Sequence, residues 1–397
     1  MGYRIASFNI QKFSRDASKS KEGSDSRKDL EMLARIIIEN AFDIIAIQEI
    51  YHAEALKALM EQMSGQYAER LLIRVKDLGH FNLNARVNDS HGYRTKQWEG
   101  RWAAPVSPNG GRIAEGYAFL WNRGKIKLVT NRDGDSFQPR IEDARDVKKL
   151  VRPPFLGRFM PINGRYEIRL INTHIVYARP SMQLEEDIEE AKEGVEFEAP
   201  NIEQDDIDLR KKEFETLIKS VYVPFSEKQY DIRHQDTKAR LLTPYTFLLG
   251  DYNLNLSTVR GLSSARLTPE LERMEIHSKD NMCIVTVGHE LTTLRGKPRD
   301  EEKQILVRYD PIVDHHLANN YDHFSYDSNR LRNHQIAYPE TGRIFAFQNY
   351  KDTEVETSFE IYRRRVSDHI PIFLDFDVKC EFFNKVTLKP GMVLRAV

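Results

Sequence analysis

The segment Asp43-Ile44-Ile45-Ala46-Ile47-Gln48-Glu49 combines a run of apolar residues with a carboxylate at its end. Four consecutive aliphatic residues are typical of a strand that is covered on both faces. Polar residues directly after such a strand lie at the edge of a sheet, where catalytic groups are held rigidly. The segment therefore predicts a buried strand that presents Glu49 at a functional edge.

The residues around this segment alternate between predicted strands and predicted helices. A strand is expected at residues 3–8, an amphipathic helix near residues 29–40 and a second helix at about residues 53–63. Strands and helices in this rhythm favour sheets that are layered with helices. Apolar or alternating runs predict further strands at 117–121, 125–129, 155–160, 166–173, 246–249, 282–287, 323–326 and 370–376, and a helix at 210–222.

The composition indicates a chain that can bury a large core, because 40% of its 397 residues are hydrophobic. No run approaches the roughly 18 apolar residues that span a bilayer, so we expect no membrane segment. The 59 basic and 60 acidic residues lack the strong positive balance of many nucleic-acid-binding proteins, although local patches can still bind phosphates. Two cysteines and an N-terminus without a secretory signal lead us to expect a cytoplasmic protein.

Length alone suggests two or three domains, but the pattern favours one catalytic domain over residues 1–378 with a C-terminal extension at 379–397. Three stretches interrupt the predicted elements, near residues 76–112, 181–208 and 295–320. The first is basic and aromatic, the second is strongly acidic, and the third begins with a charged run. None has the Pro, Gly and Ser content of a linker, so we interpret them as insertions in one domain.

Polar side chains stand where the predicted apolar strands begin or end. Carboxylate and amide oxygens suit Mg²⁺, which binds through one or two carboxylates and keeps several waters. An aspartate can orient an attacking water, and histidines can protonate or hydrogen-bond phosphate oxygens. Together these groups predict metal-assisted hydrolysis of a phosphodiester. They are Asn9, Glu49, His174, Asp251, Asn253, Asp322, Asp368 and His369.

Other catalytic classes find no support in the sequence. It contains no G-x-x-x-x-G-K, G-x-S-x-G or H-E-x-x-H pattern, which would indicate a P-loop, a hydrolase elbow or a zinc protease. The pair His315-His316 beside Asp314 does not predict a transition-metal site, because adjacent residues seldom chelate one ion.

Several short motifs, in this order, resemble the endonuclease/exonuclease/phosphatase superfamily in its deoxyribonuclease I-like form. They include Ile5–Ile10, Asp43–Glu49, Gly250-Asp251-Tyr252-Asn253 and Ser367-Asp368-His369. The resemblance covers the core from Arg4 to about Phe376. It implies an α/β fold: a four-layer αββα sandwich of two mainly antiparallel sheets flanked by helices.

The resemblance also implies a role for each matching residue. Glu49, assisted by Asn9 and Asp368, would hold a catalytic Mg²⁺, with Mn²⁺ or Ca²⁺ able to substitute or assist. Asp251 would orient or deprotonate the attacking water, and Asn253 would contact the scissile phosphate.

Two histidine pairs and an arginine complete the implied site. His369 paired with Asp322, and His174 paired with Glu115, would supply protons or hydrogen bonds to phosphate oxygens. Arg152 falls where a relative within this family has a phosphate-contacting arginine. The missing secretory signal and disulfide cysteines place the chain inside cells, while the acidic insertion and the extension put open access to duplex DNA in doubt.

Some residues keep two interpretations. Asp251 and Asn253 are also ordinary turn residues, and His174 could be a core histidine. Within Arg363–Arg365, Arg364 is our candidate for a phosphate contact, against a solvated strand edge. The basic loop at 86–112 could line a nucleic-acid groove through arginine contacts and tryptophan stacking, or bury its tryptophans as an ordered surface loop.

The predicted function is a metal-dependent endonuclease that cleaves phosphodiester bonds, with DNA as the expected partner and no membrane. The first alternative is a phosphoesterase of the same fold that acts on RNA, nucleotide second messengers or inositol phosphates. The second is a catalytically silent interaction module. The sequence does not predict the oligomeric state.

Overall fold

The computed structural model gives the arrangement of the core elements, while several predicted features lie outside the residues that it describes. Those outside are Arg364, the extension at 379–397, and most of the predicted insertions at 181–208 and 295–320. The described residues are 2–14, 28–71, 90–104, 115–130, 135–142, 150, 152–164, 166–175, 202–228, 242–255, 276–277, 282–287, 292–294, 319–331, 335–337, 362–363 and 365–377.

The first sheet contains the strand from which the sequence analysis began. That strand, β2 (Ile44–Ile50), runs parallel to β1 (Tyr3–Phe13), and every other neighbouring pair in this sheet is antiparallel. The full order is β15 (Gln335–Ala337), β16 (Ile372–Asp377), β1, β2, β6 (Gly116–Asn122), β5 (Trp98–Ala103), β4 (Ser90–Arg94) and β3 (Glu69–Leu71).

The second sheet has the same character, with one parallel pair, β10 (Tyr166–His174) and β11 (Thr243–Asp251), among antiparallel neighbours. Its order is β12 (Ile276–His277), β13 (Cys283–Val287), β14 (Asp322–Asp327), β11, β10, β9 (Phe155–Pro161) and β7 (Ile126–Leu128), and β8 (Arg140–Ile141) pairs with β9. The prediction of two mainly antiparallel sheets is confirmed.

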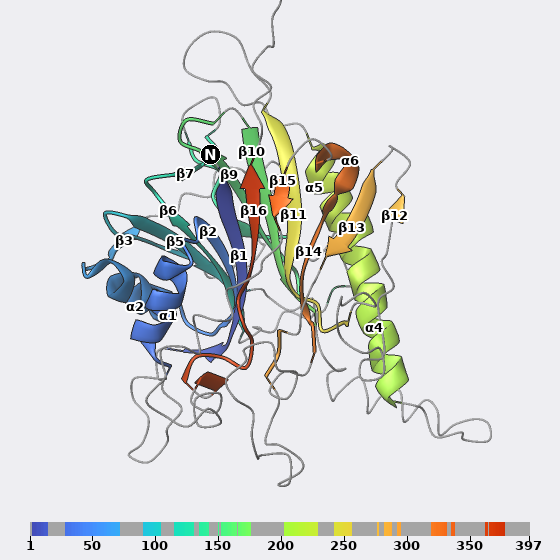
Figure 1. The fold of residues 1–397 in the computed structure, drawn as a ribbon, viewed down its shortest axis with the longest axis horizontal. Coiled ribbons are helices and arrows are strands. Elements are labelled where there is room, and N and C mark those ends of the chain that lie inside the picture. The colour runs from blue at the N-terminus through green and yellow to red at the C-terminus, as the bar shows by residue number, and fades with distance from the viewer. Residues whose placement is uncertain are drawn as a thin grey trace, which may run out of the picture.

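Helices cover the outer face of each sheet (Figure 1). On the first sheet lie α1 (Leu30–Glu39) and α2 (Ala53–Ser64), and on the second lie α4 (Ile202–Thr216), the π-helical segment η2 (Leu217–Tyr222) and α5 (Val223–Glu227). The short α6 (Ser328–Leu331) follows β14. No helix in the described part of the chain is long and apolar enough to cross a membrane.

Three buried apolar clusters separate these four layers. One lies between α1, α2 and the first sheet, and a second lies between the sheets, where Phe119 stacks on Phe155 and meets Phe159 edge-on. The third joins the second sheet to α4, η2 and α5. Aromatic contacts of this kind add to the apolar burial that holds two sheets face to face. The four-layer αββα sandwich predicted from the sequence is confirmed.

Part of the predicted insertion at 76–112 is regular sheet, since β4 and β5 lie within it. The interpretation of Trp98 and Trp102 as stacking groups of a nucleic-acid groove is wrong, because they are only 3% and 6% exposed. The Trp102 ring nitrogen donates to the Ile50 carbonyl at 3.0 Å. The sequence does not indicate a strand here because charged residues stand between the tryptophans. Arg101 can nevertheless be buried, because it pairs with Glu99 at 2.9 Å.

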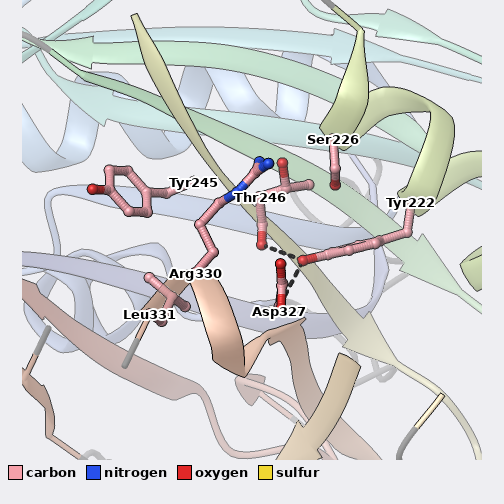
Figure 2. A pocket seen from close by; sticks show the side chains of 7 residues that line it. All are labelled: Tyr222, Ser226, Tyr245, Thr246, Asp327, Arg330 and Leu331. Atoms are coloured by element: carbon pink, nitrogen blue, oxygen red, sulfur yellow. Dashed lines mark hydrogen bonds between the residues drawn. The ribbon is translucent and has the colours of Figure 1, made fainter. Parts of the chain in front are cut away.

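A small hollow lies beside α5 and α6, toward the start of β11 (Figure 2). Within it the Tyr222 hydroxyl donates to the Thr246 carbonyl at 3.0 Å and accepts the Asp327 N–H at 2.8 Å. Asp251 stands at the other end of the same strand. The lining residues are Tyr222, Ser226, Tyr245, Thr246, Asp327, Arg330 and Leu331, so none of the predicted site residues faces this hollow.

Candidate active site

The predicted site residues in the described part of the chain gather at one edge of the sandwich. The parallel strands β1 and β2 carry Asn9 and Glu49 there, close to their ends, and β10 and β11 end there with His174 and Asp251. Antiparallel neighbours begin where these strands end, so Glu115 before β6, Asp322 at the start of β14, and Asp368 and His369 before β16 lie at the same edge.

Asp251 lies at the centre of this group and is 1% exposed. Its Oδ2 accepts a hydrogen bond from Asn9 Nδ2 at 3.0 Å, and its Oδ1 accepts the Asn253 N–H at 2.9 Å. The Nε2 atoms of His369 and His174 lie 3.4 and 3.6 Å from Oδ2. Two imidazoles from different sheets therefore flank one buried carboxylate.

Each of these histidines has its own carboxylate on the far side of the ring. His369 Nδ1 lies 2.8 Å from Asp322 Oδ2, and His174 Nδ1 contacts Glu115. Burial by itself lowers the pKa of His369, but Asp322 and Asp251 outweigh it and raise the pKa to about 10. Burial likewise opposes the charged form of His174, and Glu115 more than offsets it, so that the pKa rises. His369 is therefore a protonated donor at neutral pH, and the surroundings of His174 favour its protonated form.

Arg152 reaches this edge by pairing with Glu115. Its guanidinium spans both oxygens of that carboxylate, at 2.9 and 3.1 Å. Although burial raises the pKa of Glu115, His174 and Arg152 together bring it below its usual range. The predicted phosphate contact of Arg152 stays a prediction, and the contact that the structure does give it orients the Glu115–His174 pair.

The oxygen atoms of Asn9, Glu49 and Asp368 fit a hard divalent cation. Glu49 Oε1 accepts from Asn9 Nδ2 at 3.0 Å. One Asp368 oxygen accepts from Gln11 at 2.6 Å, while the other, Oδ1, is buried without a hydrogen-bond partner in the described structure. An uncommitted buried carboxylate oxygen beside a second carboxylate and an amide is the donor chemistry that Mg²⁺ prefers.

A second group could also hold a metal, because ligand atoms of Asp251, Asp322 and His369 lie within 4.8 Å of one another. In this group His369 already contacts both carboxylates, through Nδ1 and Nε2. A cation bound there would displace these contacts and would require His369 to lose its proton. In the Asn9, Glu49 and Asp368 group the histidine contact is longer, 3.9 Å between His369 Nε2 and Asp368 Oδ1, so this group is the better candidate.

Asn253 occupies a left-handed backbone conformation, with φ of 49°. Its side-chain amide donates to the Ile175 carbonyl at 2.8 Å, and its own carbonyl accepts from the buried Arg210 of α4, also at 2.8 Å. Asparagine tolerates this conformation better than most other non-glycine residues, and the two hydrogen bonds fix it in place. The turn after β11 therefore holds Asn253 in one orientation and does more than end the strand.

Several side chains of the site escaped the sequence analysis. Gln11 and Lys12 contact the candidate metal residues through hydrogen bonds of 2.6 to 3.0 Å. Lys28 is half-buried near Asp368 and Glu49; burial lowers its pKa to about 8, although both carboxylates oppose that shift. None of these three stands at the end of an apolar run, so the sequence pattern does not indicate them.

A polar network connects the two sheets directly beneath this edge. Gln48 Nε2 donates to Asn172 Oδ1 at 2.7 Å, and Asn172 Nδ2 donates to the Ile47 and Ala118 carbonyls at 3.0 and 3.1 Å. Both side chains are fully buried. Satisfied buried networks fix one arrangement of a core, so this one sets how the two halves of the site face each other.

Residues 6–369 match the protein-family model described as the Endonuclease/Exonuclease/phosphatase family. No curated protein matches the sequence.

Solved structures similar to the chain have low identity. They include an endonuclease/exonuclease/phosphatase from Bacteroides vulgatus, with 11% identity, 96% of this chain and 100% of that chain covered, and a TM-score of 0.43. A mannosyl-6-phosphatase of Bacteroides thetaiotaomicron has 12% identity, with 95% and 100% covered and a TM-score of 0.40. ANGEL2, a 2′,3′-cyclic phosphatase, has 13% identity, with 95% of each chain covered and a TM-score of 0.44.

Proposed function

The chain belongs to the endonuclease/exonuclease/phosphatase family, and from this premise we propose that it is a metal-dependent endonuclease that hydrolyses phosphodiester bonds in DNA. Members of this family are hydrolases that act on phosphoester bonds and generally depend on a metal ion. The observation that carries the proposal is Asp251, a buried carboxylate between two histidines that each have a carboxylate of their own.

Asp251 is the base of the proposed reaction. Burial raises its pKa, which the adjacent His369 and His174 oppose, so it is a stronger base than an exposed aspartate. Asn9 and the Asn253 N–H hold the carboxylate in one orientation. A water hydrogen-bonded to Asp251 transfers its proton to the carboxylate as its oxygen bonds to phosphorus, opposite the departing ester oxygen.

His369 and His174 act on the phosphate oxygens. As the phosphorus–oxygen bond of the ester breaks, one protonated ring gives its proton to the leaving oxygen, and the other donates a hydrogen bond to a non-bridging oxygen. Asp322 and Glu115 favour the charged form of the two rings and orient them. Glu49, Asp368 and Asn9 would hold Mg²⁺, which when bound neutralises negative charge on the phosphate.

A smaller substrate is the second candidate, and one observation favours it. The two tryptophans for which stacking on nucleic acid is one of two interpretations are buried, and Arg152 is engaged with Glu115. These three side chains are therefore not free to contact a long polyanion. A nucleotide, an RNA end or an inositol phosphate needs fewer contacts beyond the reacting phosphate.

Substrate and mechanism can be tested together by incubating the purified protein with supercoiled plasmid, single-stranded DNA, RNA, cyclic nucleotides and inositol phosphates, with Mg²⁺ or with a chelator. We expect metal-dependent nicking of plasmid that falls at least 10³-fold in Asp251→Asn and His369→Ala, because each removes a proton-transfer group. Asp208→Asn, on the exposed face of α4, is the matched control. Turnover of small substrates alone would exclude DNA, and no turnover at all would favour an interaction module.

A further inference from the structure

Strand β1 contains two consecutive residues with left-handed backbone shortly before its end. Gln11 has φ of 40° and Lys12 has φ of 53°, and the register between β1 and β2 shifts between Asn9 and Phe13. Neither residue is glycine, so each conformation is strained and persists only where the surroundings enforce it. A strand can run to its end without this strain, so the reason for it must lie in what the turn contacts.

This pair of residues, the Gln11–Lys12 turn, directs three hydrogen bonds to three different residues. The Gln11 N–H donates to Asn9 Oδ1 at 2.9 Å, and the Lys12 N–H donates to Glu49 Oε2 at 3.0 Å. The Gln11 carboxamide donates to Asp368 Oδ2 at 2.6 Å. These acceptors come from β1, β2 and the loop before β16, and they are the three residues of the proposed metal site.

The bonds leave the acceptor atoms that a cation needs. Gln11 takes Oδ2 of Asp368 and leaves Oδ1 buried without a hydrogen-bond partner in the described structure. Glu49 is held at both oxygens, by Asn9 and by the Lys12 N–H, and a carboxylate oxygen retains further lone pairs. The donors that hold these carboxylates are neutral amides, which orient them without neutralising their charge.

We propose that Gln11 and Lys12 are positioning residues, whose left-handed turn pre-orients Asn9, Glu49 and Asp368 for a divalent cation. The inference rests on the proposed function, since it assumes that the cation binds at these three residues. Groups that orient metal ligands typically change metal affinity 10- to 100-fold when they are removed. The side chain of Gln11 and the main chain of Lys12 carry the effect, and the exposed Lys12 side chain does not.

Four variants separate this role from a structural one. Gln11→Met keeps the bulk and loses the carboxamide, and Gln11→Gly loses the carboxamide but adopts a positive φ without strain. Lys12→Gly keeps the N–H that reaches Glu49. Gln62→Met, at an exposed position of α2, is the matched control for the change of side chain.

The direct readout is the dissociation constant of Mn²⁺ from the purified protein, measured by isothermal titration calorimetry, with the melting temperature of the metal-free protein beside it. We expect both Gln11 variants to bind Mn²⁺ about 10-fold more weakly than wild type. Lys12→Gly and Gln62→Met should bind Mn²⁺ with a dissociation constant that is within about twofold of the wild-type value or lower. Metal-free Gln11→Gly should melt no lower than wild type, because glycine relieves the strain.

The outcomes distinguish the inference from the function that it assumes. Wild-type protein that binds no Mn²⁺, or a Glu49→Gln variant that binds it normally, removes the proposed metal site itself. Normal Mn²⁺ affinity in both Gln11 variants, with the site intact, overturns the inference alone. A loss of Mn²⁺ affinity in Gln11→Met alone also overturns the inference, because Gln11→Gly lacks the carboxamide as well and should lose affinity equally.

Discussion

His323 follows the catalytic candidate Asp322 directly, yet its environment is the opposite of that of the site histidines. Its Nε2 contacts the Leu254 carbonyl at 2.7 Å, while Nδ1 is buried without a hydrogen-bond partner in the described structure. Burial lowers the pKa of His323 to about 4, because a proton on Nδ1 would find no acceptor. At the residue scale, alternation along β14 therefore separates a group in the site from a neutral core histidine.

This difference predicts a loss of stability in mild acid. The pKa of His323 in the folded protein lies below its unfolded value of about 6.5. The stability that comes from keeping His323 neutral is therefore fully present above pH 6.5 and is lost as the pH falls toward 4. The contribution is about 3 kcal/mol across that window. His369, with a raised pKa, makes its contribution in full below pH 6.5 and adds no slope there.

The measurement is the free energy of unfolding in urea at several pH values between 7 and 4.5. In His323→Gln, which does not titrate, the part of the decline that belongs to His323 should vanish. The difference between the wild-type and variant curves isolates this residue from the carboxylates. Parallel curves would mean that His323 accepts a proton in the folded state.

At the element scale, β11 and the π-helical segment η2 meet at the hollow of Figure 2, away from the site. Tyr222 is 1% exposed and holds β11 and β14 together through the Thr246 carbonyl and the Asp327 N–H. A π-helical turn often marks a functional position, but here its last residue makes a structural contact.

Tyr222→Phe should therefore lower stability by about 2 kcal/mol, since it leaves a buried carbonyl and a buried N–H without their shared partner. The urea midpoint should fall while the slope of the transition stays constant. Phosphodiesterase activity below the transition should be unchanged. Tyr67→Phe, at a 77% exposed position, is the control and should change the free energy of unfolding by less than about 0.5 kcal/mol. A loss of activity in Tyr222→Phe without a loss of stability would place this contact in the catalytic machinery instead.

The elements that the sequence revealed are those whose burial comes from apolar side chains. Runs such as Ile44–Ile47 can only be strands or helices in a core, so β2, β6, β10 and β11 were predicted near their observed bounds. Strand β5 was missed because Arg101 and Glu99 neutralise each other inside the fold. The helix predicted at 210–222 begins earlier, at Ile202, and becomes π-helical from Leu217.

The same division applies to the candidate site. Asp251, His174 and His369 could be named in advance, because each is a polar residue where an apolar strand begins or ends. The contribution of the Gln11–Lys12 turn lies in backbone dihedral angles, which residue types do not reveal. The Arg152 contact with Glu115 also depends on how two distant loops meet, so it appears only in the folded chain.

At the scale of the whole molecule, the prediction of one domain over residues 1–378 has not been tested and can be. The two sheets share one apolar core, and the Gln48–Asn172 network joins them beneath the site. Two sheets coupled in this way should unfold in a single transition. If they were separate domains, each would lose its structure at its own denaturant concentration.

The chain supplies a reporter for each sheet. Its three tryptophans, at positions 98, 102 and 121, all lie in the first sheet, and Cys283 lies in the second. In a Cys380→Ser background, tryptophan fluorescence and the thiol reactivity of Cys283 should change at the same urea concentration. Asn172→Ala should lower both urea midpoints together. The free energy of unfolding should fall by about 3 kcal/mol, because the substitution leaves Gln48 and two carbonyls buried without Asn172 as a partner. Midpoints that separate in wild type, or a shift confined to one reporter, would show that the sheets are independent units and that the site forms between domains.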